Sequence, residues 1–304
     1  MATAIPAAAG WHTVAGRRPS NQDAVLAGVL PDGRELIAVA DGMGGHRAGE
    51  VASQSALETL LEGVKAGHSL ASAVAAANRA LYAAAQQNPE FAGMGTTLVA
   101  LLRDGNAYQI ANVGDSRAYR IEADRLEQIT ADHTFIAEAV SQGELSEEEA
   151  QRSRWRNALT RAVGTDPDLE VDVYGPFGAL QPHAVVLCSD GFHGSVPSET
   201  LLRYVADTDP QEAAKRLTDE AYRNGSKDNI TVAVVTFGAG VSKHVVGGNG
   251  DNHHEPRLVW PVWRADTERH ASRTRRHSGL KTKIELILVV VLMTIFIALL
   301  TRIP

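Results

Sequence analysis

Several aspartates of this 304-residue sequence stand at the ends of apolar segments. Asp41 and Asp190 each follow an apolar run and precede a glycine, and Asp115 closes a third run. At Asp228 the order is the opposite, because this aspartate stands just before the apolar run 230–237. Short apolar runs of this kind predict buried β-strands, so these carboxylates would lie on the rim of a sheet.

Carboxylates on such a rim suit metal ions. Burial penalises their charged form, and they repel one another unless cations pair them. A glycine after the aspartate lets the backbone turn and leaves its carbonyl oxygen free as a ligand. With one cysteine, Cys188, and no suitably spaced histidine pair, the oxygen ligands favour Mg²⁺ or Mn²⁺ over zinc or copper. One Asp-Gly is most often only a turn, but several acids at strand ends in one domain predict a carboxylate–metal hydrolase.

The elements that must position these residues follow from the hydrophobic pattern. Strand-like runs lie at 35–40, 96–102, 107–113, 118–121, 184–188 and 230–237, and helical patterns at 49–64, 70–87, 135–140 and 211–223. Three of the strand-like runs follow one another closely, which indicates an antiparallel meander with helices packed outside. We therefore predict one mixed α/β domain over residues 11–237, preceded by a disordered N-terminus over residues 1–10.

The composition and charge exclude several classes of protein. Hydrophobic residues make up 44% of the chain and charged residues 21%, which excludes a disordered or fibrous chain. Residues 238–304 hold ten Lys or Arg against five Asp or Glu, whereas residues 1–237 hold nineteen against thirty-one. Because an acidic body repels nucleic-acid phosphates, we expect no nucleic-acid binding.

Residues 284–303 predict a membrane-spanning helix. Within them, the stretch 286–300 is apolar except for Thr294. As a helix the span would be about 30 Å long, which matches the hydrocarbon thickness of a bilayer. The basic residues before it are Arg269, Arg273, Arg275, Arg276, Lys281 and Lys283. By the positive-inside rule we expect a single-pass, tail-anchored protein of the cytoplasmic (inner) membrane, with its catalytic domain in the cytoplasm.

Residues 238–283 lose hydrophobic periodicity and become increasingly basic, as is typical of a flexible linker. The segment 258–264 is an exception, because it is apolar and contains Trp260 and Trp263. We expect this segment to dock on the body or to contact lipid headgroups, with a partner-binding motif as the alternative.

Eight short motifs follow one another along the chain: Arg18-Pro-Ser-Asn-Gln-Asp23, Val39-Ala-Asp-Gly-Met-Gly-Gly-His46, Met94-Gly-Thr-Thr97, Asn112-Val-Gly-Asp-Ser-Arg117, Thr130-Ala-Asp-His133, Leu159-Thr-Arg-Ala-Val-Gly164, Cys188-Ser-Asp-Gly191 and Lys227-Asp-Asn229. In this order the chain resembles the metal-dependent protein phosphatases (the PPM or type 2C serine/threonine phosphatases) of bacterial type, over about residues 10–237. The resemblance implies an α+β fold, a four-layer αββα sandwich of two antiparallel sheets flanked by helices, to which the C-terminal transmembrane helix would be added.

The resemblance also implies metal ligands. Asp41 corresponds to the carboxylate that bridges two metal ions, and the Gly42 carbonyl would bind one of them. Asp190 and Asp228 correspond to direct ligands of the other ion, and Asp23 to a ligand that acts largely through water. The ions would be Mn²⁺ or Mg²⁺, two in number.

Further roles follow from the same resemblance. Asp115, together with Asp190, matches a third metal site of bacterial members. Arg18 stands where the family places its phosphate-binding arginine, and a guanidinium fork suits the equatorial phosphate oxygens. The segment 135–155 corresponds to a flap beside the cleft, with Ser146-x-x-Glu149 as a capping box. A metal-bridging hydroxide would attack phosphorus directly, without a phosphoenzyme.

The chain departs from the family pattern near the expected site. Many relatives have Glu where this chain has Gln22, so the metal affinity could differ from theirs. Met43 stands where eukaryotic relatives place a histidine that is a candidate general acid. Either His46 or a metal-bound water could therefore protonate the leaving oxygen.

Taken together, these features predict a membrane-tethered phosphatase of phosphoserine and phosphothreonine proteins that opposes a bacterial Ser/Thr kinase. Two alternatives remain open. The chain could be a catalytically degenerate, membrane-anchored scaffold of the same fold, with Gln22 and Met43 as signs of decay. It could also be a metal hydrolase that acts on a small phosphoester.

Overall fold

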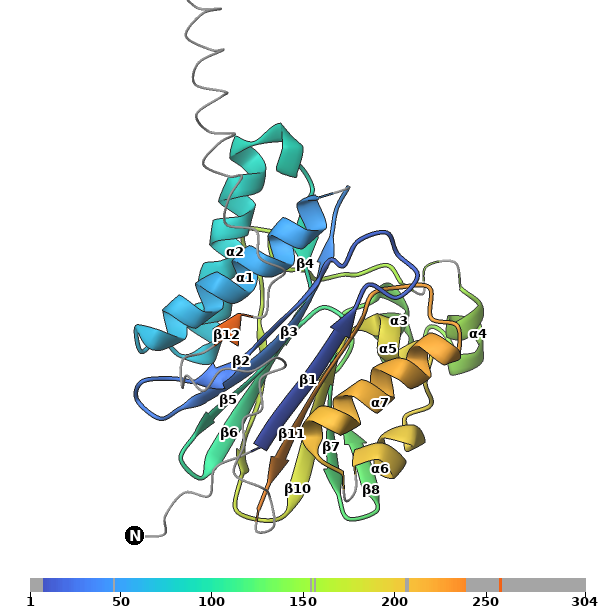
Figure 1. Cartoon of the computed structure of the whole chain (residues 1–304). Helices are drawn as coiled ribbons and strands as arrows, with labels where there is room; N and C mark the ends of the chain where they lie inside the picture. The colour runs from blue at the N-terminus through green and yellow to red at the C-terminus, as the bar shows by residue number, and fades with distance from the viewer. Residues whose placement is uncertain are drawn as a thin grey trace, which may run out of the picture. The chain divides into compact units, whose positions relative to one another are not determined.

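The computed structural model describes residues 8–45, 47–153, 155, 157–205, 208–238 and 257–258 (Figure 1). The chain divides into two units, residues 1–259 and 260–304, and all described residues lie in the first. His46, the linker residues Trp260 and Trp263, and the predicted span 284–303 lie outside the described residues. Among the described residues, none of the helices has both the length and the apolar character needed to cross a bilayer.

Two antiparallel sheets form the body of the domain. One has the order β1-β11-β10-β7-β8, with β1 at Ala8–Val14, β11 at Ile230–Phe237, β10 at His183–Cys188, β7 at Arg117–Glu122 and β8 at Arg125–Gln128. The other has the order β12-β2-β3-β5-β6-β9, with β12 at Arg257–Leu258, β2 at Asp23–Val29, β3 at Glu35–Met43, β5 at Leu98–Asp104, β6 at Ala107–Val113 and β9 at Asp172–Gly178. The short β4, Gly95–Thr96, pairs with the end of β3.

Helices cover both outer faces of the sheets (Figure 1). On the side of β3 lie α1 (Ala48–Lys65) and α2 (Leu70–Gln87), followed by a 3₁₀ turn at Pro89–Phe91. On the side of β11 lie α5 (Asp190–His193), α6 (Glu199–Val205) and α7 (Pro210–Arg223). The short helices α3 (Phe135–Ser141) and α4 (Glu147–Arg152) occupy the predicted flap segment. The sandwich implied by the resemblance is therefore confirmed.

The strands are apolar on both faces because each face packs against another layer. In β10, Val185 and Leu187 belong to the core between the sheets, whereas Val186 and Cys188 pack against α5, α6 and α7. This alternation follows from the period of two along a strand. It explains why the strands that lead to Asp41 and Asp190 read as unbroken apolar runs, and it places Cys188 in the core.

Caps fix the starts of the predicted helices. Ser69 accepts a hydrogen bond from the backbone of Ser72 at the start of α2, and Asp209 does the same for two amides at the start of α7. The predicted capping box is present in α4, where the Ser146 and Glu149 side chains each bond the other's backbone N–H. These bonds satisfy backbone donors that the first helical turn leaves free.

The prediction of disorder over residues 1–10 is wrong for its last three residues. Strand β1 begins at Ala8 and pairs with β11 from Ala8↔Thr236 onward. A Cβ at Gly10 would lie only 2.2 Å from the backbone nitrogen of Gln211, so this position needs a small residue because α7 crosses it closely. The same small residues make the strand inconspicuous in the sequence.

Candidate metal centre

Four aspartates at or next to strand ends meet at one end of the sandwich: Asp23, Asp41, Asp190 and Asp228. In the register of β2 and β3, Asp23 lies directly opposite Asp41. Strands β10 and β11 are antiparallel neighbours, so Asp190, after the end of β10, lies near Asp228, before the start of β11. The two sheets thus bring their acids together, and the charges of Asp190 and Asp228 raise the pKa of both Asp23 and Asp41.

Asp23 is buried and is bonded by two hydroxyl groups. Its Oδ2 accepts hydrogen bonds from Ser189 Oγ at 2.8 Å and from Thr231 Oγ1 at 2.7 Å. Its Oδ1 is buried without a hydrogen-bond partner. Burial, opposed by these two bonds and reinforced by Asp190 and Asp228, raises the pKa of Asp23 to about 7.

Asp41 is fixed through its backbone by the Met94-Gly-Thr-Thr97 motif. Its N–H donates to Thr97 Oγ1 at 3.0 Å, and its carbonyl accepts from the Thr97 N–H and from Thr96 Oγ1, both at 2.9 Å. The side chain is thereby left to face the other acids. Burial and then the charges of Asp23 and Asp190 hold the pKa of Asp41 well above its usual value.

Asp190 interacts electrostatically both with Asp41 and with Asp115. Its charge raises the pKa of both Asp41 and Asp115. Its own pKa is raised by burial and then by Asp228. Like Asp23, it has a buried oxygen, Oδ1, without a hydrogen-bond partner.

Two glycines next to the aspartates allow close backbone approach. Gly42 pairs with Thr96 in β4, and a Cβ on it would lie 1.9 Å from the carbonyl oxygen of Gly49. A Cβ on Gly191 would lie 1.9 Å from the carbonyl oxygen of Asn229. Close packing against neighbouring backbone therefore requires glycine at both positions, whereas neither Gly42, in β3, nor Gly191, in α5, has a positive φ.

We expect Gly191→Ala to destabilise the domain strongly, because the Asn229 carbonyl belongs to backbone that cannot move aside easily. Overpacking of this kind costs about 3 kcal/mol or more, which lowers Tm by roughly 6–12 °C in a domain of this size. The measurement is thermal unfolding by circular dichroism. Gly178→Ala is the control, because a Cβ there meets no atom within 4 Å. Equal Tm values for the two variants would contradict the packing argument.

Asp115 lies in the turn between β6 and β7, after Gly114, whose φ of 99° favours glycine. Burial and then the charge of Asp190 raise the pKa of Asp115 to about 7. The pair that the resemblance assigned to a third ion is therefore brought together. Asp115 joins the other acids from a different loop.

Arg18 lies at the edge of the acidic group and is half-exposed. Its Nη2 donates to Asp228 Oδ2 at 2.8 Å, and its Nε donates to the carbonyl of Lys227 at 3.2 Å. Its positive charge also lowers the pKa of Asp190. The guanidinium is thus beside the carboxylates, where an incoming phosphate would need a cation.

The loop that carries Arg18 is held by Asn229 of the Lys227-Asp-Asn229 motif. The Asn229 amide donates to the carbonyl oxygens of Ala15 at 3.0 Å and Ser20 at 2.8 Å. Its Oδ1 accepts from the backbone N–H of Gln22 at 2.8 Å. One side chain therefore positions Arg18 and Asp23 relative to Asp228.

Sequence reasoning missed the hydroxyl groups that hold the acids, as well as one histidine. Ser189, Thr231 and Thr97 hold the acids in place, and His193 bonds the backbone of Asp115 at 2.9 Å. Ser189 directly precedes Asp190, which was the available signal. Thr231, Thr97 and His193 contact the acids only because the fold brings distant segments of the chain together. At the departures from the family pattern, the Gln22 amide packs against Gly49 and Met43 lies close to Gly95.

The donor set fits divalent cations. Hard cations bind carboxylate and carbonyl oxygens, and two buried carboxylate oxygens, Asp23 Oδ1 and Asp190 Oδ1, have no partner. Such groups are costly to bury unless a cation compensates them. Within the ranges described, no three His, Cys, Asp or Glu side chains converge as a ligand set by themselves. Other oxygens, such as the Gly42 carbonyl and water, would have to complete the coordination of each ion.

Comparison with known proteins identifies the family. The sequence profile of protein phosphatase 2C matches residues 14–223. The serine/threonine protein phosphatase PstP of Mycobacterium tuberculosis is 38% identical over 249 residues, which cover 77% of this chain and 46% of PstP, so the chain spans about half the length of that relative. The serine/threonine phosphatase stp of Listeria welshimeri is 36% identical over 218 residues, covering 67% of this chain and 85% of stp.

A solved structure agrees with the sequence relatives. The catalytic domain of PstP in complex with two manganese ions superposes with a TM-score of 0.66 at 34% identity, covering 76% of this chain and 98% of that domain. The profile match extends over more than half of the chain and includes Arg18, Asp23, Asp41, Asp115 and Asp190. This chain belongs to the protein phosphatase 2C family.

Proposed function

We propose that this chain hydrolyses phosphoserine and phosphothreonine in proteins, using Mn²⁺ or Mg²⁺. The observation that carries the proposal is the meeting of Asp23, Asp41, Asp190 and Asp228 at one end of the sandwich, with two buried carboxylate oxygens left unpaired. Family membership and the named activities of PstP and stp support the same conclusion.

In this proposal two ions are held by Asp41, the Gly42 carbonyl, Asp190, Asp228 and Asp23, and a third by Asp115 with Asp190. When bound, the ions activate a water molecule as the nucleophile and offset the charge of the phosphate. The chain's own residues orient the groups around them. Ser189 and Thr231 fix the Asp23 carboxylate, and Thr96 and Thr97 fix the backbone of Asp41.

Arg18 would bind the phosphate of the substrate. Its guanidinium now bonds Asp228, so part of its hydrogen-bonding capacity would pass to phosphate oxygens when a cation takes over the Asp228 carboxylate. A charge-assisted bond of this kind fixes the orientation of the phosphate and offsets part of its negative charge.

The activity is tested by phosphate release from a phosphothreonine peptide by the full-length chain in detergent, with Mn²⁺, Mg²⁺ or EDTA. A small phosphoester such as p-nitrophenyl phosphate is assayed in parallel. We expect metal-dependent turnover with a higher kcat/KM for the peptide. A folded protein that is silent with every metal would overturn the proposal in favour of the degenerate scaffold, and a preference for the small ester would favour the other alternative.

Arg18→Ala is expected to raise KM for the phosphothreonine peptide and to lower kcat/KM by about 10- to 100-fold, since a hydrogen bond to a charged group is worth about 1.5–3 kcal/mol. Arg17→Ala is the matched control, because the Arg17 guanidinium lies over the Tyr222 ring, 5.8 Å from its centroid. Steady-state kinetics at saturating Mn²⁺ measures both. Similar losses in the two variants would contradict a specific role for Arg18.

We further propose that residues 284–303 anchor the chain in the cytoplasmic membrane, where it would oppose a membrane-bound Ser/Thr kinase. The support is the apolar run and the basic residues that precede it. Tethering would raise the effective concentration of the phosphatase near such a kinase and its substrates. The test is carbonate extraction of membranes from cells that express the full chain or residues 1–238. Recovery of the full chain in the soluble fraction would overturn the anchor.

A further inference from the structure

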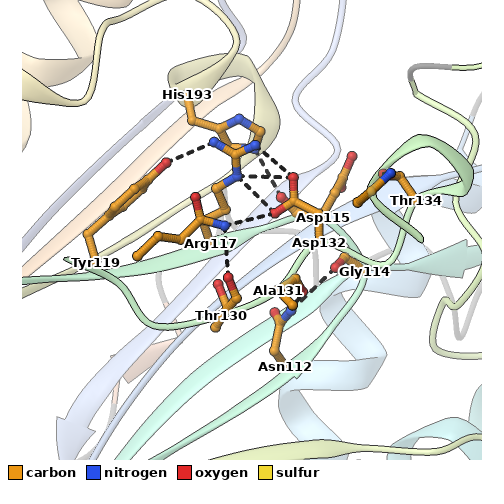
Figure 2. A network of polar contacts seen from close by, with 12 residues as sticks. Asn112, Gly114, Asp115, Arg117, Tyr119, Thr130, Ala131, Asp132, Thr134 and His193 are labelled. Atoms are coloured by element: carbon orange, nitrogen blue, oxygen red, sulfur yellow. Dashed lines mark hydrogen bonds and ion pairs between the residues drawn. The ribbon is translucent and has the colours of Figure 1, made fainter. Parts of the chain in front are cut away.

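His193 links the two parts of the chain that carry Asp190 and Asp115. It lies in α5, three residues after Asp190, and its Nε2 is 2.9 Å from the carbonyl oxygen of Asp115 (Figure 2). Asp115 belongs to the turn between β6 and β7. This hydrogen bond therefore runs directly from the element that positions one carboxylate to the backbone of the other.

His193 is the donor of this hydrogen bond. The Asp115 carbonyl oxygen only accepts, and it lies 2.9 Å from Nε2. The proton is therefore on Nε2, and it is directed at Asp115.

The residues around the ring are themselves fixed. Arg117 forms a bidentate ion pair with Asp132, with N···O distances of 2.8 Å from Nε and 2.7 Å from Nη2, and its Nη1 lies 3.0 Å from the Tyr119 hydroxyl (Figure 2). A bidentate pair of this type restricts the orientation of the guanidinium. Arg117 is thereby held in one orientation by Asp132 and Tyr119.

The other side of the same turn is held by a second histidine. His133 Nδ1 accepts from the Gly114 N–H at 3.1 Å, and the Gly114 carbonyl accepts from the His133 N–H at 3.0 Å. The His133 Nε2 lies 3.1 Å from Asp172 Oδ2, which fixes its tautomer. The backbone on both sides of Asp115 is therefore bonded, by His133 to Gly114 and by His193 to Asp115 itself.

We propose that His193 is a positioning residue that holds the Asp115 carboxylate at a fixed place relative to Asp190, so that the two can bind one divalent ion together. The proposal rests on the proposed function, because it assumes that both carboxylates are metal ligands. It gives a role to His193, which lies two residues after the Cys188-Ser-Asp-Gly191 motif. His193 acts through the backbone of Asp115 and does not touch the substrate.

The test is Mn²⁺ binding by isothermal titration calorimetry to the full-length chain in detergent. Removing a group that orients a metal ligand typically weakens metal affinity by about 10- to 100-fold. We expect His193→Ala to weaken one Mn²⁺ site, that of Asp115 and Asp190, by about tenfold or more and to leave the other sites unchanged. In parallel, the Mn²⁺ concentration for half-maximal activity should rise, with kcat at saturating Mn²⁺ retained.

Two conservative variants separate positioning from folding. The amide nitrogen of His193→Gln can occupy the place of Nε2. This variant should restore the Mn²⁺ affinity of the Asp115 and Asp190 site to within about threefold of wild type. The amide of His193→Asn corresponds to Nδ1, cannot reach the Asp115 carbonyl, and should behave like alanine. His12→Ala is the control, because His12 bonds the Thr218 hydroxyl of α7 at 2.6 Å. Its Mn²⁺ titration should match wild type.

The outcomes distinguish the two proposals. If the wild type binds Mn²⁺ and releases phosphate but all His193 variants titrate like it, the positioning role is overturned and the proposed function stands. If His193→Gln and His193→Asn lose the site equally, the donor geometry is not responsible and the positioning role is again overturned. If the folded wild type binds neither Mn²⁺ nor Mg²⁺, the proposed function itself fails.

Discussion

Replacing Asp41 with Asn is expected to lower kcat for phosphate release from a phosphothreonine peptide by about a thousandfold or more. Asp41 lies opposite Asp23, and the charges of Asp23 and Asp190 both raise its pKa, so it is the carboxylate placed to contact ions on both sides. Asn keeps the shape but removes the charge that would bind both ions and orient the nucleophilic water. Electrostatic stabilisation of this kind is usually the largest contribution to catalysis.

Asp104→Asn is the matched control for this variant. Asp104 also ends a strand and precedes a glycine, Gly105, but it is exposed and lies at the opposite end of the sheet from Asp41. We expect kcat within about twofold of wild type. Steady-state kinetics at saturating Mn²⁺ decides. If Asp41→Asn retained a tenth of the wild-type kcat, or if Asp104→Asn lost as much, the proposed role of Asp41 would be wrong.

The contrast between Asp41 and Asp104 also shows what could be read from the sequence. Both are Asp-Gly pairs at strand ends, and the motif order separates the site residues from the simple turn. The apolar runs predicted β3, β6, β10 and β11, and the helical pattern predicted α7 to within one residue. These elements are long and strongly periodic, which is where pattern reasoning is most reliable.

Other elements were hidden because packing, not strand propensity, selects their residues. Strand β1 contains Ala8, Ala9 and Gly10, and the close crossing of α7 requires the glycine. Strand β9 contains Gly175 and Pro176, which disfavour a strand in any local reading. Tertiary contacts override weak local preferences at such positions.

The supporting residues of the site could not be predicted for a related reason. The bonds from Ser189 and Thr231 to Asp23 join residues 166 and 208 positions apart in the chain. The bond from His193 to Asp115 spans 78 positions. Aspartate before glycine at a strand end is a local pattern, whereas the donors that hold it depend on which strands become neighbours.

The stabilisation of this domain by Mn²⁺ should increase steeply with pH. The folded-state pKa values of Asp23 and Asp115 are both raised to about 7 from a usual value of 3.8, mainly by burial, and burial also holds the pKa of Asp41 well above its usual value. Between pH 3.8 and about pH 7 the metal-free folded protein binds more protons than the unfolded chain does. The free energy of unfolding of the metal-free protein therefore falls as the pH rises from about 4 to about 7, and the carboxylates of the folded protein become ionised near pH 7.

Mn²⁺ competes with those protons for the same oxygens, since carboxylate ligands bind metal in their deprotonated form. At pH 5 the difference in Tm between samples with Mn²⁺ and with EDTA should be close to zero. At pH 8, with Mn²⁺ at about a hundred times its Kd, each occupied site contributes about 2.7 kcal/mol, so two sites should raise Tm by roughly 10 °C or more. Thermal unfolding by differential scanning calorimetry at pH 5, 6, 7 and 8 measures this.

The difference in Tm between the Mn²⁺ and EDTA samples at each pH isolates the contribution of the metal-binding carboxylates. Burial lowers the pKa of His12, His133, His183 and His193, so these histidines favour folding as the pH rises toward 6.5, but they do so in both samples. Asp41→Asn should reduce the Mn²⁺-dependent rise in Tm at pH 8 by half or more, and Asp104→Asn should leave it unchanged. A rise in Tm that is the same at pH 5 and pH 8 would mean that Mn²⁺ binds outside these buried carboxylates.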